Sequence, residues 1–164
     1  MKRGFTLIEL LIYLALVSVV VTSLILWVLN LSGVRNKNFA AVEVAANSQF
    51  VISEITREIK QAEAIVAPAA GAAGATLELD RPGALPNAVF RAVAGALYFE
   101  VVGNPPVAVS SSLVEVADLV FRNLTGAFDD RANVAVQAVV RFRDSASGDF
   151  AYEREINTAV SNRL

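Results

Sequence analysis

The chain has 164 residues, a formal net charge of −2, and neither cysteine nor histidine. These absences exclude a structural disulfide, a His-based catalytic triad and histidine metal ligands. After position 37, ten Lys or Arg residues stand against fifteen Asp or Glu, which argues against a general nucleic-acid surface. This C-terminal part, about 130 residues, suffices for one small domain.

The N-terminus places two basic residues, Lys2 and Arg3, directly before Gly4 and an apolar run that starts at Phe5. An ordinary secretory signal has its small-residue cleavage site after the apolar core. Here the order is inverted, so cleavage at Gly4 would leave the apolar segment on the mature protein. The sequence therefore predicts a leader at residues 1–4 and a retained helix after it.

Residues 5–29 are predicted to form a transmembrane helix. Residues 10–29 contain no charge and reach roughly 30 Å as a helix, the thickness of a bilayer's hydrocarbon core. Ser18, Thr22 and Ser23 can bond back to the helix backbone. Basic residues flank the span on both sides, but the domain follows it, so we expect a cytoplasmic N-terminus and an exported C-terminal part.

Glu9 is an acid one turn into this apolar helix. An ionised carboxylate costs on the order of 2.5 to 3.5 kcal/mol at the bilayer centre and less near the interface, so it needs a partner or a proton. One interpretation is an interfacial acid at the lipid headgroups. The other is pairing with a positive group of another chain, such as the α-amine that cleavage would expose at Phe5, which would fix register more than it adds stability.

A nine-residue stretch resembles the class III signal of type IV pilins and type II secretion pseudopilins: Gly4-Phe5-Thr6-Leu7-Ile8-Glu9-Leu10-Leu11-Ile12. The resemblance implies that prepilin peptidase cuts between Gly4 and Phe5 at the cytoplasmic face, where Lys2 and Arg3 hold the leader, and methylates the Phe5 amine. It also implies that Thr6 and Glu9 act in assembly, as subunits leave the inner membrane for a helical filament. The implied partners are the peptidase, other pilin or pseudopilin subunits, the inner-membrane assembly platform and lipid.

The chain departs from the family pattern at two points. Many members carry a proline at the twenty-second mature position, which here is Leu26, so Asn30 and Gly33 are the nearer candidates for a weak point in the helix. Many major pilins close a C-terminal loop with a disulfide, which this chain cannot form. Together with a loose similarity of residues 55–62 and 158–163 to minor subunits of the pilus W-type and secretion J-type, this favours a minor subunit.

Beyond the span, residues 30–66 are predicted to continue as an amphipathic helix. Apolar residues recur on one stripe at 3.6-residue spacing, namely Val44, Val51, Ile55, Ala62 and Val66, with Ile52 and Ile59 beside it. The charged residues Glu54, Arg57, Glu58 and Lys60 occupy the remaining faces. The alternative is two separate helices broken near Gly33.

Residues 67–75, rich in alanine and glycine, read as a linker, and the period then changes toward two over residues 76–164. Candidate strands are Ala75 to Leu79, Ala88 to Ala92, Ala96 to Val102, Val114 to Asn123, Asn133 to Arg143 and Phe150 to Ala159. The last two predict a hairpin, in which Arg141 and Arg143 would face Glu153 or Glu155. The fold class is α+β, a long helix packed on a mostly antiparallel sheet, as the pilin resemblance also implies.

Chemistry in the domain is sparse, and we expect no enzyme activity, metal or cofactor. Asp129 and Asp130, with Asp144 and Asp149, lack a regular calcium-ligand spacing and are interpreted as solvated turn acids. Asn123-Leu124-Thr125 fits a glycosylation sequon, a pattern common by chance. The sequence thus predicts a structural filament subunit; the alternative is an uncleaved signal-anchored periplasmic or surface protein with a sensory or enzymatic domain.

Overall fold

A computed structural model describes residues 6–126, 132–143 and 150–162. One helix, α1 (Leu7–Gln61), runs unbroken through 55 residues, a length of about 82 Å. The predicted alternative of two helices broken near Gly33 is therefore wrong. A single glycine costs a helix only about 1 kcal/mol, and the chain has no proline before Pro68 to interrupt the backbone hydrogen bonds.

The strands form two antiparallel sheets where a single sheet was predicted, and the α+β class is confirmed. The first sheet has the order β1-β3-β4-β5-β6 and the second the order β2-β7-β8-β9. The strands are β1 (Ala64–Ala67), β2 (Ala73–Gly74), β3 (Thr76–Asp80), β4 (Ala88–Val93), β5 (Ala96–Val101), β6 (Val107–Ala108), β7 (Val114–Asn123), β8 (Asn133–Phe142) and β9 (Glu153–Ser161).

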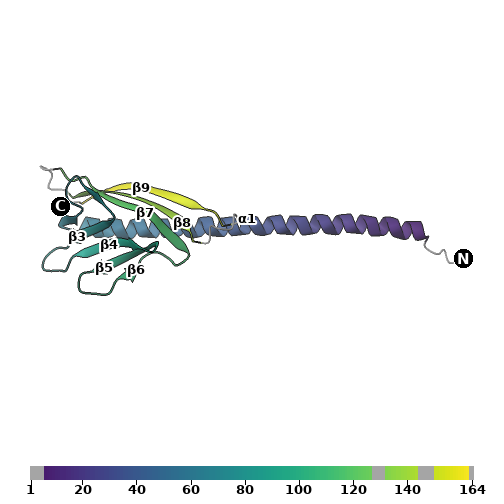
Figure 1. Cartoon of the computed structure of the whole chain (residues 1–164), viewed down its shortest axis with the longest axis horizontal. Coiled ribbons are helices and arrows are strands. Elements are labelled where there is room, and N and C mark those ends of the chain that lie inside the picture. Colours follow the sequence, from purple (N-terminus) through teal and green to yellow (C-terminus); the bar gives the residue numbers. More distant parts are fainter. Residues whose placement is uncertain (1–5, 127–131, 144–149, 163–164) are drawn as a thin grey trace.

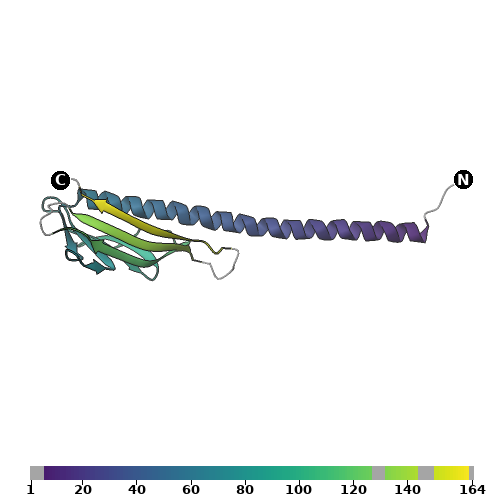
Figure 2. The ribbon, with the colours of Figure 1, turned by 90° about the horizontal axis from the view of Figure 1, so that it is seen from above.

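The two sheets lie against the C-terminal half of α1 and leave its N-terminal half projecting alone (Figure 1). Seen from above, the helix lies along one margin of the sheets, so one flank of its C-terminal half stays open (Figure 2). The buried helical face packs on inward residues of both sheets. The largest fully buried side chains include Val44, Val51, Ile55, Ile59, Leu77, Leu79, Phe90, Leu97, Val114, Phe121, Val134 and Val140.

The helix ends at Gln61, five residues before the predicted end at Val66. Val66 lies instead in β1, where it is 49% exposed, and β1 pairs with β3. A residue that precedes a proline disfavours the helical backbone conformation, so Ala67, before Pro68, favours an extended one. The segment read as a linker, 67–75, also contains β2, which pairs with β7.

The C-terminal hairpin strands pair antiparallel as predicted, and the alternating side chains Val134, Val136, Ala138, Val140 and Phe142 are all buried. The predicted ion pairs differ. Arg141 bonds Glu115 on β7 through two hydrogen bonds of 3.0 Å, although Glu153 is its partner in register on β9. The turn residues 144–149 lie outside the described residues.

Candidate functional site

Helix α1 begins with a capping arrangement that places Glu9 in its first turn. Thr6 is the N-cap, with extended backbone angles of −82° and 151°, and its Oγ1 accepts a hydrogen bond of 3.4 Å from the Glu9 N–H. The spacing Thr-x-x-Glu is the sequence signature of a capping box. Thr6 therefore fixes the start of the helix immediately after Phe5, a role that the motif could have predicted.

The Glu9 side chain is exposed in the described chain, and it lies at the positive end of the helix dipole. Its backbone N–H is used by Thr6, while the carboxylate stays available to a group outside this subunit. Of the predicted processing and assembly residues, the structure brings Thr6 and Glu9 together. Lys2, Arg3, Gly4 and Phe5 lie outside the described residues.

The N-terminal half of α1 has the properties of a membrane span. The helix contains an 18-residue window with a mean hydropathy of 2.6, none of it buried against the described chain. Two of its hydroxyl side chains bond back to the helix backbone as predicted: Ser18 donates to the Ala15 carbonyl and Thr22 to the Ser18 carbonyl, each at 2.8 Å. Such self-contained hydrogen bonding is what a hydrocarbon environment requires.

Comparison with known proteins identifies the N-terminal segment. Residues 1–25 match the family described as the prokaryotic N-terminal methylation motif. The chain carries a class III prepilin leader. This leader implies processing by prepilin peptidase, partners of the pilin type and anchoring in a membrane. No curated protein and no solved structure matches the chain.

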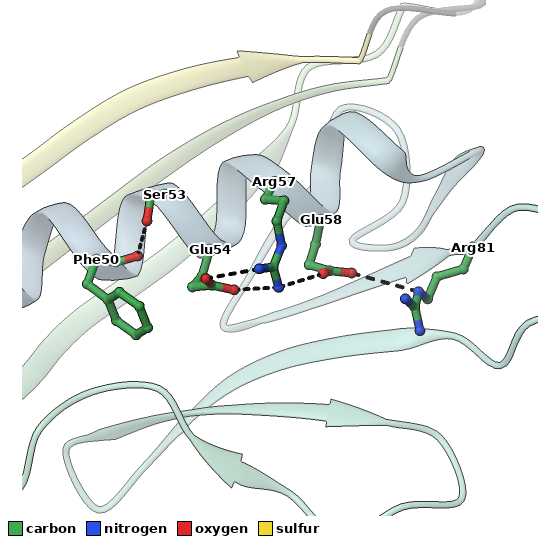
Figure 3. A network of polar contacts seen from close by, with 6 residues as sticks. All are labelled: Phe50, Ser53, Glu54, Arg57, Glu58 and Arg81. Atoms are coloured by element: carbon green, nitrogen blue, oxygen red, sulfur yellow. Dashed lines mark hydrogen bonds and ion pairs between the residues drawn. The ribbon is translucent and has the colours of Figure 1, made fainter.

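A chain of ion pairs joins the distal part of α1 to the loop after β3 (Figure 3). Arg57 lies between Glu54 at 2.6 Å and Glu58 at 3.2 Å, and Glu58 also faces Arg81 at 3.8 Å. Glu58 was predicted on an outer helical face, but its side chain is only 5% exposed. Two arginines compensate its burial, so this carboxylate fastens the helix to the first sheet.

The carboxylate of Glu115 and the guanidinium of Arg141 form the ion pair that couples β7 to β8. The hydrogen bond from Arg141 is the largest cause that lowers the pKa of Glu115 from its ordinary 4.5, while desolvation opposes it. The same hydrogen bond raises the pKa of Arg141. The pair is solvent-exposed. Because both groups stay charged at neutral pH, the ion pair has a structural role.

The glycosylation sequon is closed in the folded domain. Asn123 is 3% exposed; its Nδ2 donates to the Pro68 carbonyl at 2.9 Å and its Oδ1 accepts from the Thr125 N–H at 3.0 Å. A transferase would have to open this buried site and break the hydrogen bond from Nδ2 to the Pro68 carbonyl to reach the amide nitrogen. The asparagine is therefore a structural residue of the strand end.

The structure does not test the metal site that four aspartates were considered for. Asp129, Asp130, Asp144 and Asp149 all lie outside the described residues. Within residues 6–126, 132–143 and 150–162, no three His, Cys, Asp or Glu side chains gather in a group that could hold a metal ion.

Proposed function

We propose that this chain is a structural, non-enzymatic subunit of a type IV pilus or type II secretion pseudopilus, of the minor class. The match of residues 1–25 to the methylation motif carries the proposal. The 55-residue helix, capped directly after the cleavage position and uncovered along its N-terminal half, supports it. The missing cysteines and the loose C-terminal similarity favour the minor class.

In this proposal the chain is first a single-pass inner-membrane protein with its N-terminus in the cytoplasm. Prepilin peptidase cuts between Gly4 and Phe5 and methylates the Phe5 amine. Thr6, the residue after Phe5 in the sequence, is the helix cap, so cleavage would expose the new amine four residues before Glu9. The assembly platform then moves the subunit into an extracytoplasmic filament.

Glu9 guides this assembly by pairing with a positive group on a neighbouring subunit. Within its own chain the carboxylate is exposed, and in lipid an ionised, unpaired carboxylate is costly. A neighbour's Phe5 amine neutralises it and fixes the register of the two helices. The acid is thereby a recognition element, which explains its place in an otherwise apolar segment.

Glu9→Leu tests this role. We expect the variant to be inserted and cleaved as the native chain is, because neither step uses the carboxylate, but to enter sheared filaments poorly. Ser18→Leu is the matched control, since it adds apolar bulk to the same helix without removing a charge. Filament incorporation of Glu9→Leu at the native level, in cells that process it normally, would remove the proposed pairing.

A further inference from the structure

The segment of α1 between the span and the packed half carries only positive charge. No acid occurs between Glu9 and Glu43, whereas Arg35 and Lys37 lie in this interval and are both exposed. Neither forms an ion pair with a described residue. This local basic charge contrasts with the acidic excess of the domain that follows, so it points to an anionic contact close to the membrane.

The unbroken helix sets the height of these cations above the bilayer. At about 1.5 Å per residue, Arg35 lies about 9 Å and Lys37 about 12 Å beyond Leu29, the end of the apolar stretch. The headgroup layer of one leaflet is roughly 5 to 8 Å thick. Long basic side chains reach back toward a membrane surface, so both cations can contact headgroups.

Apolar side chains of the domain lie just above these cations. Phe39 is 52% exposed and meets Phe142 edge-on, with ring centroids 6.0 Å apart, and Phe142 stacks on Phe150 at 5.5 Å. Leu113, which is 42% exposed, accepts a hydrogen bond from the Arg143 N–H at 2.9 Å. These residues form one aromatic and apolar corner.

The register of the strands shows that this corner is the membrane-facing end of the domain. Phe142, at the end of β8, is paired with Val114 and contacts Phe39, near the start of the packed half of the helix. At the opposite end of the sheet, the Asn162 side chain donates to the Ala62 carbonyl, at the end of the helix. The second sheet thus runs along the helix, with its Phe142 end toward the span.

We propose that Arg35, Lys37, Phe39 and Leu113 form a lipid-contact surface that meets the headgroups of an anionic leaflet when the helix tilts, because Phe39 lies about 15 Å beyond Leu29 along the helix. The surface is continuous with the span, its charge complements anionic lipid, and its aromatic and aliphatic groups suit the membrane interface. The contact holds the domain against the bilayer before the subunit is extracted. This inference requires insertion of the helix and is independent of filament assembly.

The chain has no cysteine, so single labels can be introduced without a background. Leu113→Cys puts a spin label on the proposed surface. Leu85→Cys is the matched control, because it is 52% exposed but lies two residues after Gly83, whose N–H donates to Glu63 beyond the far end of the helix. The full chain is reconstituted in nanodiscs of phosphatidylcholine, with or without one part in three of phosphatidylglycerol.

Relaxation of each label by a nickel-chelating lipid measures its distance from the headgroups. We expect strong relaxation for Leu113→Cys, weak relaxation for Leu85→Cys, and a further increase for Leu113→Cys with phosphatidylglycerol. Each cation changes the equilibrium constant of the contact about fivefold, so adding Arg35→Gln and Lys37→Gln should lower this constant about 25-fold in anionic discs.

The dependence of the relaxation on lipid charge distinguishes a specific lipid contact from a domain that lies near the bilayer only because the helix holds it there. Equal relaxation of the Leu113→Cys label in neutral and anionic discs, and with or without the two glutamine substitutions, would overturn the proposal. The proposal would also be overturned if the Leu113→Cys spin label became immobilised, and protected from relaxation by the nickel-chelating lipid, only when other pilin subunits are added. The surface would then be a protein interface. Circular dichroism of each variant checks that the fold is retained.

Discussion

Asn123→Ala should destabilise the domain by removing hydrogen bonds that hold the segment after β1 to the end of β7. The side-chain amide bonds the Pro68 carbonyl at 2.9 Å and the Thr125 N–H at 3.0 Å, and the residue is 3% exposed. The Pro68 carbonyl, in a buried residue, would lose this partner, whereas half-buried Thr125 remains accessible to water. A buried unsatisfied group costs about 1 to 3 kcal/mol, which is the expected loss.

Urea unfolding of the detergent-solubilised chain, followed by circular dichroism of the sheet, measures this loss. With a slope of about 2 kcal/mol per molar urea, the midpoint should fall by about 0.5 to 1.5 M. Asn157→Ala is the control, because Asn157 is an exposed residue of β9 and should change stability by less than about 0.5 kcal/mol. Equal midpoints for the two variants would refute the reasoning about buried amide bonds.

Three further substitutions test the packing and the charge pairs. Gly95→Ala forces a side chain onto a backbone with φ of +75° and brings Cβ to 2.5 Å from the Glu115 Cγ, whereas Gly83→Ala meets the same φ with nothing within 4 Å. In both variants, backbone strain should lower the free energy of unfolding by about 1 to 2 kcal/mol. Thermal unfolding should show a larger loss for Gly95→Ala because of its steric contact, and equal losses would contradict that contact. Since Arg141 lowers the Glu115 pKa below its ordinary 4.5, the pair's stabilisation is fully present above that pH and disappears as pH falls through the lowered value. The difference in unfolding free energy between the native chain and Glu115→Gln should therefore be constant from neutral pH to about 5 and shrink below it; a difference that grows on acidification would reverse the assigned sign. Ile59→Ala, at a fully buried helical position, should cost about 2 to 5 kcal/mol in denaturant unfolding, and a loss under 0.5 kcal/mol would place Ile59 outside the core.

The long strands β7 and β8 could be predicted from the sequence because inward and outward residues alternate along them, throughout β8 and with one change of phase in β7, between Ala117 and Val120. Val114 to Asn123 matches β7 at both ends, and Asn133 to Arg143 exceeds β8 by one residue. Strand β9 begins three residues after the predicted start at Phe150 and ends two residues after the predicted end at Ala159. The short strands β1, β2 and β6 have two to four residues, too few to show a period. The division into two sheets depends on pairings such as β2 with β7, which local patterns do not encode.

The helix illustrates the same limit on a smaller scale. Val66 fits the apolar stripe, yet the preference of Ala67-Pro68 for an extended chain and the pairing of β1 with β3 end the helix at Gln61. Glu58 reads as a surface acid until the fold brings Arg81 to it from the first sheet. A residue distant in sequence supplied the compensation, so the burial of the charge could not be inferred locally.

The leader residues were assigned from the motif alone, and the structure added the cap. Thr6 and Glu9 have the capping-box spacing, so the cap could have been predicted from the sequence as well. The cap explains why the helix starts where the mature chain is proposed to start. The proposed partner of the Glu9 carboxylate lies in another molecule, so neither one sequence nor one subunit can display it.

The central claim is that residues 1–4 are removed and the new N-terminus is methylated. Intact mass and N-terminal sequencing of the chain, purified from membranes of cells that contain prepilin peptidase, test this claim most directly. We expect a chain that starts at N-methylated Phe5. A chain that retains Met1 to Gly4 under these conditions would contradict the proposed function and favour an uncleaved signal anchor.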